Sequence, residues 1–419
     1  MQDGADSGGV EHGSAALDDA PSPYRWVVLG AGTLAQGATA AIFLGLASVT
    51  PLLRSTYDLG VPGVGVLLGL ISAGILLTLL PWGLLTDRVG ERPVMVAGLA
   101  GASAALCTLA VVHSAGLAAA LLLLTGAAGA SVNAASGRAV LTWFPHRGRG
   151  LAMGVRQSST PLGAAAAAAF LPALGGAHGL SAVYRALAAV CLLSAILAAA
   201  AIHEPHPAPA RPAGRGRLRV VLSNRGLWRL SLASGLLVVP QFTLGALLVE
   251  YLHDAKGVAV AAAAAVLGVA QFSSAGARLV VGAWSDHVGS RAGPLRTVGL
   301  ATGASFLVLA SFDHATVGPA VLVPVLVLAV VLATCWNGLA FTLAGEMAPP
   351  GQGAAAMSLQ NSANYLAAAF TPVLAGAVAA HFSWTAVFVL AGTAAVSSAI
   401  LLRQGARLDT SMRAGTTAG

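Results

Sequence analysis

Long apolar runs, separated by short polar segments, dominate the chain from residue 24 onward. A helix needs about 20 apolar residues to cross the hydrocarbon layer of a bilayer, because each residue advances it by about 1.5 Å. The runs are continuous and do not alternate, so they predict helices and exclude the ~10-residue alternating strands of a membrane barrel. We therefore predict an all-α membrane protein with twelve transmembrane helices, at residues 26–49, 61–85, 93–113, 116–143, 150–174, 181–202, 227–250, 258–284, 294–312, 317–345, 352–379 and 383–402.

Polar segments divide the predicted helices into two sets of six. Residues 1–23 lack the basic start and the apolar core of a signal peptide, so we predict a disordered tail. The longest connection, at 203–226, is rich in Pro and Arg and is predicted to be a cytoplasmic linker. It joins an N-terminal six-helix bundle at 24–202 to a C-terminal one at 227–403, and a cytoplasmic tail follows at 404–419.

The composition agrees with this pattern. Apolar residues make up 57% of the chain and charged residues 9%, whereas soluble domains have about 25% charged residues, which excludes an ordinary water-soluble enzyme. The net charge is +7, but the cations lie between apolar runs and Lys256 is the only lysine, which argues against a nucleic-acid partner. Cys107, Cys191 and Cys335 lie inside apolar runs without the spacing of a metal site, so we expect packing residues and neither a metal nor a cofactor.

The arginines indicate the orientation of the chain. Basic loops stay on the cytoplasmic side of a membrane, and one set of loops, together with the C-terminal tail, carries most of the cations: Arg88, Arg92, Arg147, Arg149, Arg211, Arg215, Arg217, Arg219, Arg225, Arg291, Arg296, Arg403, Arg407 and Arg413. The opposite loops carry Arg54, Arg185 and Lys256. We therefore expect a multi-pass protein of the plasma membrane with both termini in the cytoplasm.

The two halves repeat one another. The segment GLLTDRVGER follows the second predicted helix and GAWSDHVGSR follows the eighth; their first residues, Gly83 and Gly282, lie 199 positions apart. Two pairs of amide residues also recur, Gln36 with Gln241 and Asn133 with Asn337. A duplicated six-helix unit is how many transporters build two halves that rock about a shared central site.

These features resemble the major facilitator superfamily, and the resemblance covers residues 24–403. GLLTDRVGER is similar to the signature loop between helices 2 and 3 of that superfamily, and GAWSDHVGSR to its degenerate copy between helices 8 and 9. The resemblance implies that this loop is a latch that stabilises an outward-open state. That gating role passes by position to Gly83, Asp87, Arg88, Gly90, Arg92, Gly282, Asp286, Gly289 and Arg291. The alternative is that the loop charges are simply solvated and follow the positive-inside rule.

Two arginines lie deep within predicted helices. Arg156 is about six residues inside the start of its helix and Arg278 about six residues inside the end of another, so each lies roughly 9 Å deep. An Arg at mid-helix costs at least ~2.5–3.5 kcal/mol on insertion scales, so it normally faces a cavity. In the resembled architecture these two helices face one another, so both guanidinium groups are expected to reach one central site. The alternative is that both side chains snorkel to the headgroups.

No Asp or Glu lies deep in a predicted helix, and Glu250 and Glu346 lie at or near helix ends. Two deep cations without a deep anion predict a site that an anionic substrate completes, because guanidinium groups bind carboxylates in bidentate geometry. Arg278, four residues before Gly282, is similar to the substrate arginine of monocarboxylate, oxalate and nitrate porters. The segment GRGLAMGVRQSS at 148–159 is similar to helix 5 of cyanate- and nitrate-type porters.

Neutral polar residues complete the predicted site. The candidate substrate-binding residues, besides the two arginines, are Gln36, Asn133, Gln157, Gln241, Asn337, Gln360, Asn361 and Asn364, extended by Thr160, Gln271 and Tyr365. For each of them the alternative is a hydrogen bond between helices. Arg138 is expected to pair with Asp87 or with a headgroup.

The sequence thus favours a secondary transporter for a small organic anion, most simply a monocarboxylate, that works by alternating access with proton symport or exchange. The anion, protons and the bilayer are its expected partners, Glu346 is a candidate proton carrier, and we expect a monomer. The alternative is a drug or metabolite efflux carrier of the same fold, although Leu122 stands where many proton-coupled members carry an Arg, and the pattern around Pro161 is incomplete. A membrane enzyme or receptor is disfavoured, because the apolar runs contain no catalytic constellation and the chain has no nucleotide-binding loop.

Overall fold

The computed structural model describes residues 22–203, 216–313 and 317–416. Within these ranges the chain forms helices and no strand, so the predicted all-α fold is confirmed. Nearly all of the predicted tail at 1–23 and half of the predicted linker at 203–226 lie outside the described residues.

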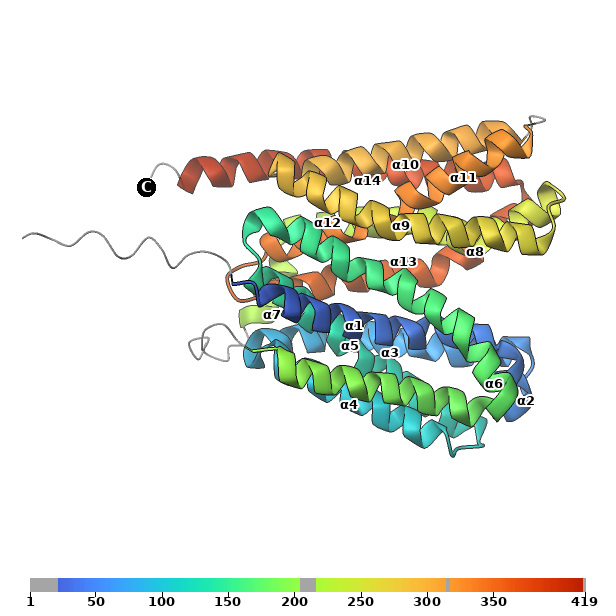
Figure 1. Ribbon diagram of the computed structural model, residues 1–419. Helices are drawn as coiled ribbons and strands as arrows, with labels where there is room; N and C mark the ends of the chain where they lie inside the picture. The colour runs from blue at the N-terminus through green and yellow to red at the C-terminus, as the bar shows by residue number, and fades with distance from the viewer. Residues whose placement is uncertain (1–21, 204–215, 314–316, 417–419) are drawn as a thin grey trace, which may run out of the picture.

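The first half of the chain supplies six crossings (Figure 1). Its helices are α1 (Arg25–Phe43), the 3-10 helix η1 (Gly45–Val49), α2 (Thr50–Tyr57), α3 (Val61–Val89), α4 (Glu91–Leu109), α5 (Ala115–Trp143), the 3-10 helix η2 (His146–Gly148) and α6 (Arg149–Ala201). α6 contains two predicted helices, because Gly179 has φ 75° and ψ 175° inside it and turns the chain back. Side chains rarely tolerate such a φ, so glycine suits this turn.

The second half has the same number of crossings. Its helices are α7 (Gly216–Ser223), α8 (Arg225–Glu250), the π-helix η3 (Tyr251–Ala255), α9 (Val260–Val288), α10 (Ala292–Asp313), α11 (Pro319–Thr334), α12 (Asn337–Glu346), α13 (Gly353–His381) and α14 (Trp384–Thr416). In the described residues, 11 helical segments are long and apolar enough to cross a membrane. Since one of them covers both arms of α6, they account for the twelve predicted crossings.

The helix predicted at 317–345 is broken. α11 ends at Thr334 and α12 begins at Asn337, with a short turn between them. A break in a membrane helix leaves backbone carbonyls that other groups must satisfy. Here the carbonyl of Thr334 accepts a hydrogen bond from Nε of Arg278 at 3.1 Å. The Asn337–Gly338 dipeptide, a common turn signal, lies at this break, but the apolar residues on both sides of it favoured one continuous helix.

Two other predicted ends also differ. α1 stops at Phe43, and the rest of the helix predicted at 26–49 continues as η1. α14 continues to Thr416, beyond the predicted end at residue 402. Helix formation therefore extends past the apolar run at the C-terminal end.

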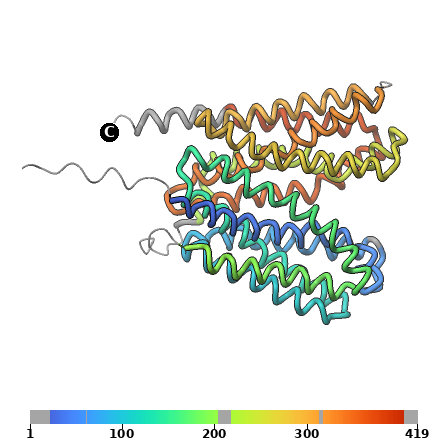
Figure 2. The backbone as a smooth tube through the Cα atoms, viewed as in Figure 1, coloured from blue at the N-terminus to red at the C-terminus, as the bar shows by residue number. Residues whose placement is uncertain are grey.

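The two halves lie side by side, and the described chain begins and ends at the same end of the molecule (Figures 1 and 2). Large apolar side chains are exposed on the outer surface, among them Leu77, Phe170, Phe272 and Val373. An exposed apolar surface of this kind suits contact with lipid tails, and the chain is a multi-pass membrane protein.

Glycines let the helices approach closely. A methyl group at Gly126 on α5 would overlap the carbonyl oxygen of Ile71 on α3, and one at Gly74 on α3 would overlap the carbonyl oxygen of Leu123 on α5. The backbones of α3 and α5 are therefore in direct contact, which is how small residues stabilise helix pairs in a bilayer.

Gly126→Ala tests this contact. The added methyl group would force α3 and α5 apart, and overpacking of this kind costs about 1–3 kcal/mol. We expect a midpoint of thermal unfolding in detergent that is several degrees lower. Gly69→Ala on α3, where the methyl group would meet nothing within 4 Å, is the matched control and should leave the midpoint unchanged. Equal midpoints for the two variants would contradict the packing.

Candidate functional site

Two carboxylates join the halves near the end where both termini lie. Asp87, on α3, accepts hydrogen bonds from the backbone N–H groups of Ala354 and Ala355 in the first turn of α13, at 3.1 and 2.9 Å. In the repeated segment, Asp286 on α9 accepts from the N–H groups of Gly150 and Leu151 in the first turn of α6, at 3.0 and 2.8 Å. Each half thus caps the positive N-terminus of a helix from the other half. We call this region the closed end.

The glycines of the repeated segments permit these contacts. A methyl group at Gly83 would lie 2.8 Å from the carbonyl oxygen of Ala354, and one at Gly282 would overlap the carbonyl oxygen of Gly150. Gly90 has φ 90° and Gly289 has φ 66°, a backbone conformation that favours glycine. These glycines therefore fix both the close approach of the halves and the turn that follows each carboxylate.

On the α3 side of the closed end, Arg138 of α5 lies 3.5 Å from Asp87 and 3.1 Å from Glu91. The expected pairing of Arg138 with Asp87 is confirmed. Arg88 and Arg92 are exposed and make no ion pair among the described residues. Of the predicted loop charges in the first half, Asp87 alone reaches the other half.

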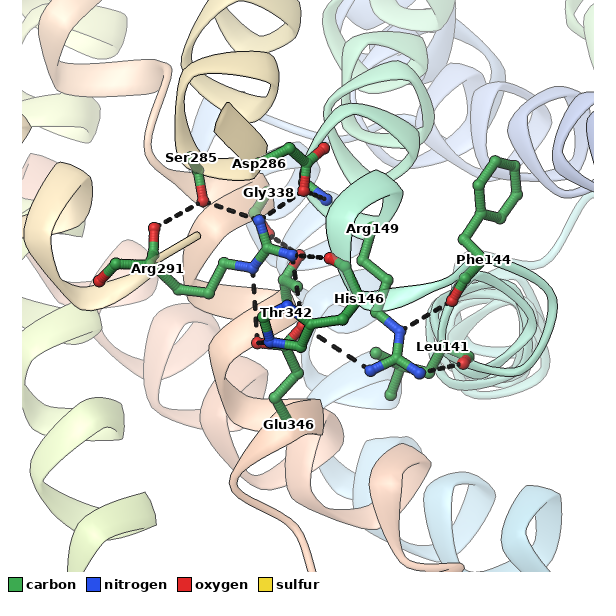
Figure 3. Close-up of polar contacts among 12 residues, drawn as sticks. Leu141, Phe144, His146, Arg149, Ser285, Asp286, Arg291, Gly338, Thr342 and Glu346 are labelled. Atoms are coloured by element: carbon green, nitrogen blue, oxygen red, sulfur yellow. Dashed lines mark hydrogen bonds and ion pairs between the residues drawn. The ribbon is translucent and has the colours of Figure 1, made fainter. Parts of the chain in front are cut away.

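On the α9 side, Arg291 lies at the centre of an ion-pair network (Figure 3). Its guanidinium is 2.6 Å from Asp286 and 3.4 Å from Glu346, and it donates to the carbonyl of His146 in the other half. Glu346 is also 3.3 Å from Nε2 of His146 and 3.7 Å from Arg149. The second copy of the signature segment therefore holds the closed end through charges from both halves.

Arg156 is the most deeply buried cation, with no exposed surface. It donates to Oγ of Ser136 at 2.7 Å, Oε1 of Gln157 at 2.8 Å, Oε1 of Gln36 at 3.2 Å and the carbonyl of Asn133 at 2.9 Å. The guanidinium also lies 5.2 Å from the centre of the Phe341 ring, across the interface between the halves. With its donors directed at protein atoms, Arg156 does not snorkel, and among the described residues no carboxylate pairs with it.

Arg278 crosses between the halves. It is 5% exposed and donates to the carbonyl of Thr334 in its own half and to the carbonyl of Gln157 in the other half. The two arginines were expected to meet in a shared cavity. In the structure they meet instead at Gln157: Arg156 donates to its side-chain oxygen and Arg278 donates to its main-chain carbonyl. The break after α11 also leaves the carbonyl of Thr334 free to accept from Arg278, which holds the side chain in this position.

A cavity of about 140 Å³ lies between the halves, next to Arg156. It is lined by Gln36, Phe43, Leu44, Asn133, Gln157, Thr160, Val238, Gln241, Phe242, Asn337, Phe341, Asn361, Asn364, Tyr365 and Ala368. Most of the predicted polar residues therefore come together. Arg156, Arg278, Gln271 and Gln360 do not line this cavity, and Gln360 is fully buried. Tyr365 was predicted, but the cavity residues Phe43, Phe242 and Phe341 were missed, because Phe in an apolar run carries no signal of its own.

The repeated amide pairs form matching hydrogen bonds. Nε2 of Gln36 donates to Oδ1 of Asn133 at 3.1 Å, and Nδ2 of Asn337 donates to Oε1 of Gln241 at 3.1 Å. All four side chains line the cavity. The internal repeat of the sequence thus reappears as a pair of equivalent contacts on opposite walls.

The comparisons with known proteins agree with this architecture. The family model described as Major Facilitator Superfamily matches residues 30–370. The chain belongs to the Major Facilitator Superfamily. It is 34% identical over 372 residues to the uncharacterized MFS-type transporter Rv2994 of Mycobacterium tuberculosis, a match that covers 88% of this chain and 82% of the relative. The predicted family is confirmed, and the protein is a membrane transporter.

Solved structures of several transporters share the fold. The human organic anion transporter MFSD10 (TETRAN) has a TM-score of 0.73 at 19% identity, over 91% of this chain and 100% of that chain. FucP in the outward conformation has a TM-score of 0.74 at 16% identity, over 91% and 99% of the two chains. At these identities the likeness shows the fold alone.

Removing one carboxylate should loosen the closed end. Asp286→Asn keeps the shape of the side chain but removes the charge at the N-terminus of α6, an interaction that contributes about 0.3–1 kcal/mol. The reporter is a cysteine in place of Ser358, which is 2% exposed and faces Gly83, in a background with the native cysteines replaced by alanine. We expect a membrane-impermeant maleimide to label it about two- to fivefold faster, as that free energy implies.

Arg88→Gln is the control for this measurement, because it removes an exposed charge from the equivalent loop. It should leave the labelling rate unchanged. A rate that rises as much with Arg88→Gln as with Asp286→Asn would show that the helix-capping carboxylate does not hold the closed end.

Proposed function

We propose that this transporter carries a small organic anion, such as a short monocarboxylate, across the plasma membrane by alternating access. Arg156 carries the proposal, because it is a buried cation whose partners are neutral oxygens. Leaving a buried charge without a counter-ion is costly, and an anion in the adjoining cavity supplies one. Since the chain builds the cavity from its own two halves, a monomer is sufficient for this function.

Arg156 also places a positive charge directly behind the cavity residues Gln36, Asn133 and Gln157, to which it donates hydrogen bonds. A guanidinium contains only donors, so Gln36 and Gln157 must face it with their oxygens and turn their NH2 groups elsewhere. A negative charge about 6 Å from the guanidinium would gain about 3 kcal/mol at an effective dielectric constant of about 20. This magnitude is enough to favour an anion over a neutral molecule of the same shape.

Arg278 adds positive charge at the boundary between the halves. Its hydrogen bond to the carbonyl of Gln157 joins α9 to α6 in this state. When the two helices separate, that bond breaks and the guanidinium becomes free to bind substrate. Arg278 therefore serves as a substrate ligand in the state in which the closed end is open, which agrees with its similarity to the substrate arginines of anion porters.

We assign the state described here as closed toward the cytoplasm. The excess of arginine in the loops at the end where the termini lie supports a cytoplasmic location for that end. The cavity is sealed from the cytoplasm by the helix caps of Asp87 and Asp286 and by the Arg291 network. Transport requires that these contacts break while others form at the opposite end, so they act as the cytoplasmic gate.

Coupling to protons, where it occurs, involves the gate. Glu346 is held by His146, Arg149 and Arg291. A proton on Glu346 would weaken these pairs and favour opening, whereas an anion exchanger needs no such step. Proton symport and anion exchange are therefore separated by whether an inward pH gradient accelerates uptake.

An efflux carrier for drugs or other metabolites is the second candidate. The rings of Phe43, Phe242, Phe341 and Tyr365 line the cavity, and aromatic linings suit amphipathic molecules. In that function Arg156 would only hold the amides in place. The two candidates differ in whether transport depends on the charge of Arg156.

Arg156→Gln distinguishes the two candidate functions in an uptake assay. Labelled short carboxylates are added outside proteoliposomes, with and without an inward pH gradient. We expect kcat/KM for carboxylate uptake to fall by about 100-fold, because a lost interaction of about 3 kcal/mol changes a rate by that order. Arg156→Lys should retain more activity, since it keeps the charge.

Arg54→Gln, which removes an exposed cation at the opposite end, is the control and should not change uptake. Melting curves confirm that each variant folds. If Arg156→Gln folds, transports every carboxylate at the normal rate and alters only resistance to drugs, the anion proposal is refuted and the efflux function is favoured.

A further inference from the structure

The two walls of the cavity present different hydrogen-bonding groups. On the wall of the first half, Arg156 fixes Gln36 with its oxygen inward, so Nε2 of Gln36 donates to Oδ1 of Asn133. Asn133 must then present its NH2 group, since an amide has one oxygen and one nitrogen end. Gln157, whose oxygen also accepts from Arg156, presents its NH2 group as well. This wall offers donors next to a positive charge.

The wall of the second half differs. The carbonyl of Thr334 can only accept, so the NH2 group of Asn337 must face it, and the two are 3.0 Å apart. The same NH2 group donates to Oε1 of Gln241, which uses both of its hydrogens. Asn337 is therefore left with its oxygen as the group it can offer to the cavity, whereas Gln241, whose oxygen accepts this bond, offers its NH2 group. The second wall thus has an acceptor where the first wall has donors beside a cation.

The difference follows from one substitution between the repeats. Asn133 and Asn337 are 204 positions apart, and the residue 204 positions after Arg156 is Gln360. The second half thus has a neutral amide where the first half has a cation. No guanidinium fixes the orientation of Gln241. Instead, the carbonyl of Thr334, which the end of α11 leaves without a helical partner, accepts from the NH2 group of Asn337 and so fixes the orientation of Asn337.

Asn364 provides an independent observation on the same wall. It lines the cavity and is 7% exposed. Its Oδ1 atom is buried and has no hydrogen-bond partner among the described residues. Buried polar atoms are nearly always paired in native structures, so this oxygen indicates a donor that is supplied from the cavity.

We infer that the substrate anion is hydroxylated: its carboxylate binds the donor wall of Asn133 and Gln157, and its hydroxyl groups donate to the oxygens of Asn337 and Asn364. This inference rests on the proposed function and narrows its substrate class from plain monocarboxylates to hydroxy acids. The cavity of about 140 Å³ has the volume of about five water molecules, which suits an acid of roughly four carbons. A substrate ammonium group is disfavoured, because no carboxylate lines the cavity and Arg156 lies beside it.

The test compares acids that differ only in hydroxyl groups. Uptake into proteoliposomes is measured for butyrate, 3-hydroxybutyrate and threonate, which have zero, one and three hydroxyl groups, with 2-aminobutyrate and the neutral polyol erythritol as further probes. We expect kcat/KM for threonate to exceed that for butyrate by at least about tenfold, since each hydroxyl group that pairs with a buried acceptor contributes a factor of several.

Asn364→Leu removes the unpaired acceptor at nearly constant volume and should reduce the threonate-to-butyrate ratio by about fivefold or more, as the loss of one such hydrogen bond implies. Asn364→Ser is the second variant, in case the leucine variant does not fold. Thr371→Val, on the same helix α13, is the control: Thr371 is buried, bonds to the carbonyl of Ala367 and does not line the cavity. It should leave the ratio unchanged.

The outcomes separate this inference from the proposed function. If butyrate is transported as well as threonate, or 2-aminobutyrate better than either, the hydroxyl assignment fails and the anion proposal stands. If erythritol is transported as well as threonate, the carboxylate site fails and with it the anion proposal. If none of the acids is transported, both fail.

Discussion

The positive charge of Arg156, buried without a carboxylate partner, is the constraint on which the rest of the site depends. A guanidinium in this position must satisfy its donors with neutral oxygens, and it takes them from Ser136, Gln36, Gln157 and the carbonyl of Asn133. Those bonds fix which end of each amide faces the cavity. One cation thus determines both the sign of the potential and the pattern of donors that a solute meets.

The two halves keep the repeated architecture but divide the charges differently. In the first half, the acid Glu91 follows the repeated Asp87 and pairs with the cation Arg138 on α5. In the second half, the cation Arg291 follows the repeated Asp286 and pairs with the acid Glu346 on α12. Helix capping by the repeated aspartates is common to both. The shared architecture is the one that transporters use to rock two halves about a central site, and the departures from symmetry give the halves different ion pairs and leave Arg156 without a counterpart.

The sequence was sufficient for the fold because lipid imposes long apolar runs, and sufficient for the amide pairs because the repeat marks Gln36 and Asn133 twice. The break between α11 and α12 was not predicted, because the turn signal of Asn337 and Gly338 stands between two long apolar segments, and so the partner of Arg278 was not found. Gln360 appeared equivalent to the cavity residues, but burial depends on how the helices rotate about their axes. These features follow from packing over long distances in the chain, which no local pattern contains.

The central claim is that the cavity recognises negative charge through Arg156. The most direct measurement is the thermal unfolding of the purified protein with saturating butyrate and, separately, with butyramide, which has the same shape without the charge. Ligands that bind the folded state raise the midpoint, so the account predicts a rise with butyrate, little change with butyramide, and no difference between the two in Arg156→Gln. Equal shifts for butyrate and butyramide in the unaltered protein would contradict it.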